Sequence, residues 1–387
     1  MPQSNDLSRS LTALHQDSTL IAAIEMSQKS WLVGAMVPGV ERQPLKKLVP
    51  DAEALLRLLQ RWREEAVAAG GRIARLVVAY EAGRDGFWLA RWLQARGIEA
   101  YVIHPSSVPV SREHRRAKTD RLDLGLLLRA LLGWLRGERG HCSMAAIPSL
   151  QAEDARRPSR QREALVGERT RIVNRIKSTL ARFGVRDVAL HRKAVERLRG
   201  LRTPEGVGLP PNTLAELDRD LARLQLVKEQ IGTIERTRLE RLQQPADTDT
   251  ARAMLATLAR VYGLGVETAD VLVHEVMLRN LRDRRAVARY GGLTGAPDES
   301  GARRRDKGLS RTGNARVRRI MLQLAWRFLL FQKQSALVQW FQARTADGRP
   351  QTRKTMILAL ARKLLIALWR LATTGEVPQG LILRPAA

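Results

Sequence analysis

Four acidic residues in the first third of the sequence could together hold a divalent metal ion. Glu25 follows the apolar run IAAI and Glu81 follows the run LVVAY, so each is expected where a buried strand ends. Asp120 and Asp123 stand three residues apart in KTDRLDLG, a spacing that a helix places on one face. Converging carboxylates repel one another unless a cation lies between them, and all-oxygen ligands favour Mg²⁺ or Mn²⁺ over zinc. Such ions can activate a nucleophile and stabilise a leaving oxygen in phosphodiester chemistry.

Each of these acids also has a simpler interpretation. Asp120 and Asp123 follow the basic run REHRRAK and could be helix N-terminal acids that the helix dipole favours. Glu25 alone could be a surface residue at a strand end. The combination of two strand-end acids with a helical pair is what favours a metal site.

The segment around the acids alternates strand-like and helix-like patterns. Strands are expected at 18–26, 31–37, 40–48, 72–80 and 98–104, and helices at 52–70, 85–96 and from about residue 120. The first two connections are too short for crossover helices, so the first three strands should pair antiparallel. This order predicts an α/β layer fold of the ribonuclease H-like kind, with Glu25 and Glu81 facing one crevice at the carboxyl ends of adjacent strands.

Ser300 stands beside a glycine, just before a basic segment. A serine there could attack a phosphodiester if a base or metal removed its proton and nearby cations stabilised the developing charge. No histidine lies near it in sequence, so the local residues alone favour an ordinary turn serine. Arginine suits phosphate recognition. The residues expected to contact nucleic acid are Arg115, Arg116, Lys118, Arg303, Arg304, Arg305, Lys307, Arg311, Asn314, Arg316, Arg318 and Arg319.

The charge of the whole chain supports a polyanionic partner. The 387 residues include 67 Lys and Arg against 39 Asp and Glu, a net charge of +28. Nucleic acid is the usual partner of so basic a chain, and an anionic membrane is the alternative. The basic residues are spread over the whole chain, and the apolar stretches at 124–135 and 356–372 are interrupted by Arg or Lys. We therefore expect no membrane span, no signal peptide and a cytoplasmic location.

Cysteine and histidine usage excludes two other classes of site. A single cysteine, Cys142, allows neither an intramolecular disulfide nor a thiolate metal cluster. The six histidines have no HxxxH or HxH spacing, so a zinc site is not expected.

The remainder of the chain is predicted to be mainly α-helical. Residues 148–160 are polar and contain proline, which indicates a linker, and two long helical patterns at 163–183 and 213–242 suit an antiparallel pair or an intermolecular coiled coil. From 249 to 377 the pattern is mostly helical. In it, GLGVETADVLVHE could be a helix-hairpin-helix that binds phosphate through its amides, or an ordinary turn between helices.

Several blocks of this sequence resemble one known family. AIEMSQKSW, VVAYEAGRDGFWLARWL, VIHPSSV, AKTDRLDLGLL, YGGLTGAPDESG and SRTGNARVRRIMLQLAW resemble the bacterial transposases of the insertion-sequence one-ten family, which are relatives of the Piv and MooV invertases. The resemblance covers about residues 18–380. It implies a RuvC-like catalytic domain at 18–147, a linker at 148–160, a helical coiled-coil region at 161–245 and a C-terminal transposase domain at 249–380.

The resemblance also implies roles for individual residues. The acidic tetrad falls on Glu25, Glu81, Asp120 and Asp123, with Glu25 where the family normally has Asp. The family's essential serine falls on Ser300. Similarity further implies a covalent phosphoserine link to DNA, a structured guide RNA encoded by the element, and a homo-oligomer of two to four subunits.

Two other functions fit the same residues. A metal-dependent Holliday-junction-type nuclease would use the four acids and leave Ser300 dispensable. A basic nucleic-acid scaffold without enzymatic activity would give no reason for acids at two strand ends. The sequence alone does not give the DNA targets, the guide RNA or the exact oligomeric state.

Overall fold

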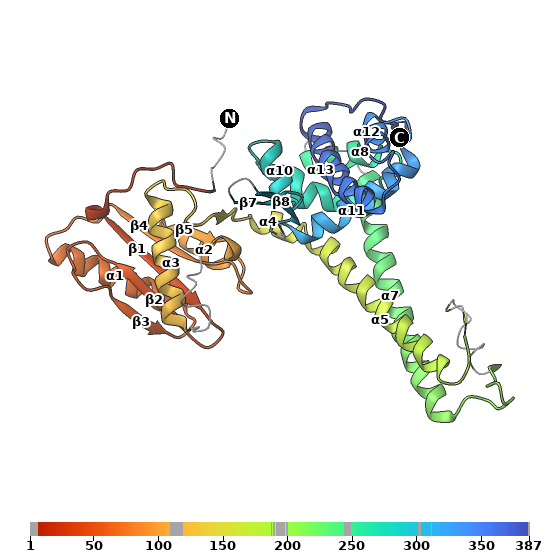
Figure 1. The fold of residues 1–387 in the computed structure, drawn as a ribbon. Coiled ribbons are helices and arrows are strands. Elements are labelled where there is room, and N and C mark those ends of the chain that lie inside the picture. Colours follow the sequence, from red (N-terminus) through yellow and green to blue (C-terminus); the bar gives the residue numbers. More distant parts are fainter. Residues whose placement is uncertain are drawn as a thin grey trace. The chain divides into compact units, whose positions relative to one another are not determined.

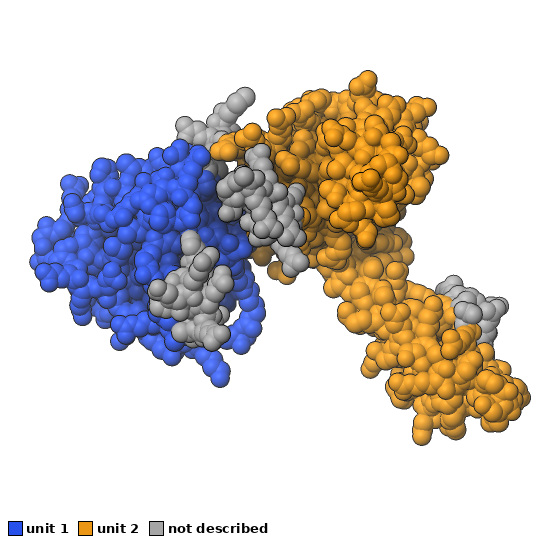
Figure 2. All heavy atoms as spheres, viewed as in Figure 1, with its two compact units in different colours: residues 1–151 blue, residues 152–387 orange. Residues whose placement is uncertain are grey.

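In the computed structural model, the protein forms two compact units, Met1–Gln151 and Ala152–Ala387 (Figure 2). It describes residues 7–108, 119–186, 200–243, 249–300, 303–310 and 312–385, together with the single positions 188, 190 and 198. Side chains are not described at 297–300 and 303–307.

The first unit is built on a mixed sheet of six strands. They are β1 (Thr19–Met26), β2 (Trp31–Met36), β3 (Leu45–Leu48), β4 (Arg75–Glu81), β5 (Glu99–Ile103) and β6 (Met144–Ala145), in the order β3-β2-β1-β4-β5-β6. The first three pair antiparallel, β4 and β5 are parallel to β1, and β6 is antiparallel to β5. The predicted ribonuclease H-like arrangement is therefore confirmed, and β6 is a strand that the sequence analysis missed.

Helices cover both faces of this sheet, as Figure 1 shows. They are α1 (Ala52–Ala68), α2 (Trp88–Gln94) and α3 (Asp120–Leu135), with short 3₁₀ turns η1 (Gln16–Ser18) and η2 (Pro105–Ser107). Side chains alternate along a strand, so Leu20 and Ile24 of β1 pack in the core that includes α1 and α2. Ile21 and Ala23 instead pack against α3. The odd-numbered residues of β1 thus face α3.

Local sequence explains where α1 and α3 begin and how closely α3 packs. The Asp51 side chain accepts a hydrogen bond from the Glu53 amide, as expected for the N-cap of α1, and Thr119 accepts one from Leu122 at the start of α3. A Cβ at Gly34 of β2 would lie 2.9 Å from Leu124 Cδ2. The absence of a side chain at Gly34 therefore lets α3 lie close to the sheet.

The second unit is mainly helical. Its elements are α4 (Leu150–Asp154), α5 (Arg157–Ala181), α7 (Pro211–Gln243), α8 (Thr250–Ala259), α9 (Val266–Leu272), the π-helical turn η3 (Val273–Met277), α10 (Arg284–Tyr290), β7 (Gly295–Ser300), β8 (Arg303–Leu309), α11 (Ala315–Phe331), α12 (Ala336–Arg344) and α13 (Pro350–Thr374). The helices from α8 through α13 share one hydrophobic core. The β7–β8 hairpin is an addition to the mostly helical structure predicted for 249–377.

The boundary between the two units falls inside the segment 148–160 that was predicted to be a linker, and most of this segment is helical. It contains α4 and the first turn of α5. Ser159 is buried, and its hydroxyl donates to the Asp270 carboxylate of α9 at 2.5 Å. A polar sequence here reflects contacts with other polar groups inside the second unit, which local composition does not reveal.

The helices α5 and α7 form a long antiparallel pair within the chain (Figure 1). Their shared core contains the apolar stripes predicted from sequence, including Ile172 and Ile176 against Leu217 and Leu224. Two ion pairs at 2.5 Å each show the antiparallel direction, because Arg162 near the start of α5 pairs with Glu235 of α7, whereas Arg175 further along α5 pairs with the earlier Asp220. Among the described residues, no helix is long and apolar enough to cross a membrane.

Candidate functional site

Glu25 and Glu81 lie at the carboxyl ends of two neighbouring parallel strands. The register pairs Ile24 of β1 with Tyr80 of β4, so the two acids occupy the next position on each strand. Both are odd-numbered positions on the face that α3 covers, since Val77 of β4 also packs in that core. Glu25 is half-buried and Glu81 is exposed. The placement expected from sequence for this pair is thus present.

Asp120 and Asp123 stand in the first turn of α3. Asp120 is exposed and Asp123 is half-buried. Because α3 packs on the face that carries Glu25 and Glu81, all four carboxylates belong to one face of the sheet. Thr119 caps the helix, which leaves the aspartates free of that task.

The ligand atoms of these four residues suit a hard divalent cation, because all of them are carboxylate oxygens. In the part of the chain that the structure describes, no three acidic, histidine or cysteine side chains are grouped closely enough to hold a metal ion. The acids therefore share a face without forming a ligand cluster in this structure.

Ser300 is the last residue of β7, opposite Arg303 in the hairpin register. The same register places Glu299 opposite Arg304 and Asp298 opposite Arg305. The serine thus ends a strand of a charged β-hairpin, where the local residues favoured an ordinary turn. The side chains of Ser300, Arg303, Arg304, Arg305 and Lys307, and the whole of Arg115, Arg116, Lys118 and Arg311, lie outside the described residues.

The base of this hairpin is held by hydroxyl and backbone contacts. The Ser310 amide donates to the Thr294 carbonyl at 3.1 Å, and the Thr294 and Ser310 hydroxyls are 3.3 Å apart. Gly313 has φ +83°, and a Cβ there would lie 2.5 Å from the Arg289 carbonyl oxygen. Only glycine fits this position without strain, because the conformation is left-handed and the space is filled by backbone.

Asn314 connects the hairpin to the helices beneath it. Its side-chain oxygen caps α11 by accepting from the Arg316 and Val317 amides. Its amide nitrogen donates to Glu275 at 3.2 Å and to the Tyr290 hydroxyl at 3.1 Å. The sequence predicted a nucleic-acid contact for Asn314, whereas the structure engages both ends of its side chain inside the protein.

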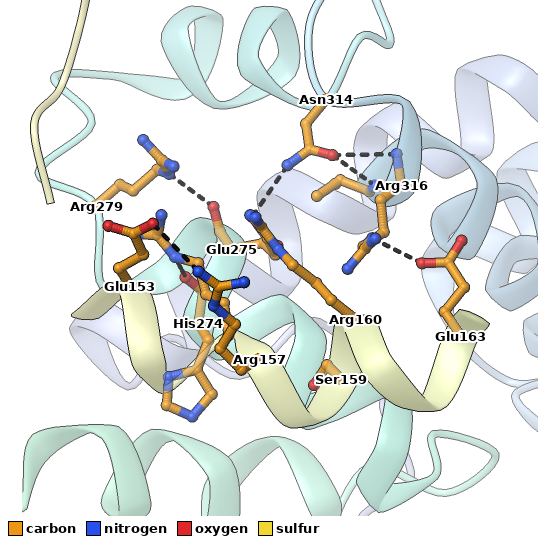
Figure 3. A network of polar contacts seen from close by, with 12 residues as sticks. Glu153, Arg157, Ser159, Arg160, Glu163, His274, Glu275, Arg279, Asn314 and Arg316 are labelled. Carbon is orange, nitrogen blue, oxygen red and sulfur yellow. Dashed lines mark hydrogen bonds and ion pairs between the residues drawn. The ribbon is translucent and has the colours of Figure 1, made fainter. Parts of the chain in front are cut away.

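Glu275 is the centre of the network drawn in Figure 3. It is 3% exposed and lies in the π-helical turn η3. Its Oε1 accepts two bonds from the Arg160 guanidinium, at 3.1 and 2.9 Å, while its Oε2 accepts from Asn314. Arg279 donates to the Glu275 main-chain carbonyl at 2.9 Å. One buried carboxylate therefore links α5, η3 and the start of α11.

Arg156 adds further positive charge to this network. Its guanidinium donates to the His274 carbonyl at 3.1 Å. Burial and then the charge of Arg279 lower the pKa of Arg156, against the opposing effect of Glu275. The positive charges of Arg156 and Arg279 thus repel each other, and the Glu275 carboxylate offsets part of this repulsion.

The predicted arginines on α11 also have partners inside the unit. Arg316 and Arg319 pair with Glu163 of α5, at 2.7 and 2.5 Å, and Arg318 donates to the Thr312 carbonyl at 3.2 Å. Arg319 is 59% exposed at its side chain, against 24% for Arg316. Arg319 is therefore better placed than Arg316 to reach an external phosphate.

The turn between α8 and α9 has the geometry of an interhelical turn. Gly263 has φ +87°, and Gly265 is the N-cap residue of α9. The first turn of α9 carries Glu267, which pairs with Arg238 and, at 3.0 Å, with Arg162. An acid at this helix start repels phosphate, so the ordinary-turn interpretation is favoured over a phosphate-binding hairpin.

Asp270 and Arg238 form a second buried ionic group. Arg238 is 6% exposed and lies 3.1 Å from the Asp270 carboxylate. Burial raises the pKa of Asp270, but the hydrogen bond from His274 and the Arg238 charge lower it more, so the net shift is downward. Asp270 thus stays ionised and ties α9 to α7.

Glu275, which links α5, η3 and the start of α11, was not predicted from the sequence. Its signal is an acid inside the apolar run VLVHEVM, where a buried helix is otherwise expected. An acid in such a run is buried at a cost unless it is paired. That pattern indicates a buried partner, although it does not identify Arg160 or Asn314.

Comparisons with known proteins give consistent results. Residues 255–337 match the model of the Transposase IS116/IS110/IS902 family, and residues 39–184 match the transposase model for the DEDD domain of IS110 elements. The chain is 40% identical over 398 residues to the provisionally named transposase y4rJ of Sinorhizobium fredii, covering 99% of this chain and 100% of that protein. It is 26% identical over 316 residues to the transposase for insertion sequence element IS1328 of Yersinia enterocolitica, covering 78% and 85% respectively.

Proposed function

Because this chain belongs to the IS116/IS110/IS902 family of transposases, we propose that it cuts and rejoins DNA with an acidic tetrad and a serine nucleophile. The chain is a DNA transposase, and its family implies that it binds DNA. The match to the DEDD domain further implies dependence on a divalent metal. The observation that carries the proposal is the common sheet face of Glu25, Glu81, Asp120 and Asp123.

The four carboxylates would hold the metal, Mg²⁺ or Mn²⁺, through oxygen atoms alone. When bound, the metal would supply Lewis-acid stabilisation of the phosphate and leaving oxygen. Glu25 stands where the family normally has Asp, and its longer side chain places the carboxylate one methylene further from the strand. The half-buried position of Glu25 at the end of β1 supports its assignment to the tetrad.

Ser300 would act as the nucleophile. Its oxygen attacks the DNA phosphorus and forms the O–P bond of a phosphoserine, while the bond from phosphorus to the DNA sugar oxygen breaks. The serine loses its proton and the departing DNA oxygen gains one. Attack by another DNA end on the phosphoserine reverses these bond changes and rejoins a strand. The basic partner strand of the hairpin, with Arg303, Arg304 and Arg305, supports this role by supplying positive charge.

The proposed partners are two DNA segments, a structured guide RNA and further copies of this chain. The net charge of +28 supports simultaneous binding of more than one nucleic acid. The guide RNA, a dimer or tetramer and a cytoplasmic location come from the family resemblance and the sequence, and each remains a proposal.

Detection of a covalent adduct tests the proposal. The purified chain is incubated with element-end DNA, the flanking RNA and Mg²⁺, and DNA–protein adducts that survive denaturation are measured. We expect an adduct with the wild type and none with Ser300→Ala. Thr355→Ala is the matched control, since it also removes a hydroxyl from the second unit but at an exposed position of α13 outside the hairpin, and it should retain the adduct.

The second candidate function, a Holliday-junction-type nuclease, rests on the same four acids. It predicts metal-dependent cleavage that Ser300→Ala leaves unchanged, and this result would replace the serine mechanism. Asp120→Asn and Asp123→Asn should abolish activity under either proposal. Recombination at wild-type rates in both variants would remove the acids from the mechanism.

A further inference from the structure

We propose that an exposed aromatic surface of the second unit binds an unpaired base of a single-stranded nucleic acid. This surface, the Tyr262 platform, combines Tyr262, Leu330, Phe331 and Ile382 with the basic residues Arg260, Arg327, Lys333 and Arg384. Tyr262 is 43% exposed, Phe331 38% and Leu330 67%. The inference deepens the proposed function, because it assumes that nucleic acid is the partner.

Three segments that are far apart in the sequence are joined at this surface by one buried side chain. Gln332 is 0% exposed and lies just after α11. Its amide nitrogen donates to the Tyr262 carbonyl at 2.8 Å and to the Ile382 carbonyl at 2.9 Å, and its oxygen accepts from the Ile382 amide at 2.8 Å. The turn after α8, the end of α11 and the segment after α13 are thereby fixed together.

The two aromatic rings are held in a defined arrangement. Tyr262 and Phe331 meet edge-on, with ring centroids 5.5 Å apart and an interplanar angle of 89°. A Cβ at Gly263 would lie 2.8 Å from Phe331 Cβ, so the glycine lets the turn approach this side chain closely. Exposed rings that are already positioned lose little conformational entropy when a partner binds.

Cations flank both rings. The Arg384 guanidinium lies 5.8 Å from the Tyr262 ring centroid, and that of Arg327 lies 6.0 Å from the Phe331 ring centroid. Arg260 and Lys333 are exposed and stand two residues from Tyr262 and Phe331 in the sequence. The three segments, residues 256–264, 326–333 and 379–385, contain no Asp or Glu. The platform therefore combines aromatic rings with positive charge alone.

This combination selects among possible occupants. A second copy of the surface would bring like charges together, on a chain whose net charge is already +28. A DNA duplex would satisfy the cations through its phosphates but would leave the rings unused, since its bases are stacked on one another. An unpaired nucleotide satisfies both, because its phosphate meets arginine and its base stacks on an aromatic side chain.

A binding measurement without catalysis tests the platform. Fluorescein-labelled short oligonucleotides of one sequence, as single-stranded RNA, single-stranded DNA and duplex DNA, are titrated with the full chain in EDTA, and anisotropy is recorded. Tyr262→Leu should weaken binding of the single strands about tenfold, the loss expected for one base stack. Duplex affinity should change by less than about twofold, because the cations remain. Comparison of the RNA and DNA strands decides which strand chemistry is preferred.

Two control variants separate stacking from other effects. Tyr262→Trp keeps an aromatic face and should bind single strands as the wild type does. Trp88→Leu removes another aromatic side chain, 40% exposed and on the first unit, and should leave binding unchanged. As an independent readout, photocrosslinking of a 4-thiouridine oligonucleotide should map to the Tyr262 or Phe331 peptides.

Several outcomes would overturn the inference. One is an equal loss of single-strand and duplex binding in Tyr262→Leu. Another is unchanged binding of all three probes together with an altered mass in light scattering, which would make the platform a protein interface. Because no DNA is cleaved in EDTA, failure here leaves the Ser300 adduct experiment unaffected. If no Ser300 adduct were detected, the result of the binding measurement would likewise be unaffected.

Discussion

Replacement of Glu275 should destabilise the second unit and loosen the base of the Ser300 hairpin. This carboxylate is 3% exposed and accepts hydrogen bonds from Arg160 and Asn314. Glu275→Ala removes the acceptor and leaves positive groups facing one another. Loss of one member of a buried ion pair costs about 3–5 kcal/mol. The exposure of Arg160, 46% at its side chain, puts the expected value near the lower limit, at about 3 kcal/mol.

Thermal unfolding and hydrogen exchange measure this effect. For a unit of this size, about 3 kcal/mol corresponds to a fall in Tm of roughly 6–12 °C. Glu275→Gln keeps the shape and one acceptor oxygen, which the alanine variant loses, so a smaller fall in Tm is expected for it than for Glu275→Ala. Exchange at the amides of Arg316 and Val317 should accelerate, because Asn314 caps both and is itself held by Glu275.

Glu163→Ala is the matched control. Glu163 also accepts bonds from two arginines, Arg316 and Arg319, but its side chain is 32% exposed. A partly exposed pair contributes at most about 1 kcal/mol, so the fall in Tm should be at most about 4 °C. Equal shifts of Tm in Glu275→Ala and Glu163→Ala, with unchanged exchange in the first turn of α11, would show that burial of Glu275 does not stabilise this unit.

Three further predictions concern other parts of the chain. In urea unfolding, Gly313→Ala should lower the free energy of unfolding by more than Gly308→Ala does. Both glycines have a left-handed φ, but of the two only a Cβ at Gly313 would meet backbone atoms within 4 Å. Equal losses of free energy would contradict this. Burial raises the pKa of the Cys142 thiol to about 12, so iodoacetamide at pH 8 should leave the native chain unmodified and alkylate it once unfolded; rapid native labelling would contradict the burial. The hydrogen bond from Arg175 lowers the pKa of Asp220, so its stabilising effect is complete above about pH 4 and is lost as pH falls through the lower folded-state pKa. Asp220→Asn should therefore be less stable than wild type at pH 7, and a difference that does not shrink on acidification would contradict the pairing.

Local sequence patterns predicted most of the fold of the first unit. Continuous apolar runs predicted the buried strands β1 and β4, and the short connections predicted the antiparallel pairing of the first three strands. The acids Glu25 and Glu81 could be placed because strand ends follow directly from the ends of apolar runs. The apolar stripes of α5 and α7 were equally readable, since helical periodicity is a local property.

Partners of polar residues could be known only from the tertiary structure. Asn314 and Arg316 belong to a basic segment that predicts phosphate contacts, yet their acidic partners are Glu275 and Glu163, some 39 and 153 residues earlier in the chain. The Tyr262 platform likewise depends on Gln332 and Ile382, whose spacing in the sequence carries no signal. Periodicity determines which face of an element is buried, but the packing of distant elements determines which polar groups meet on it. The sequence by itself therefore determined the elements and the acidic candidates, while only the tertiary structure decided which charges are used inside the protein and which face outward.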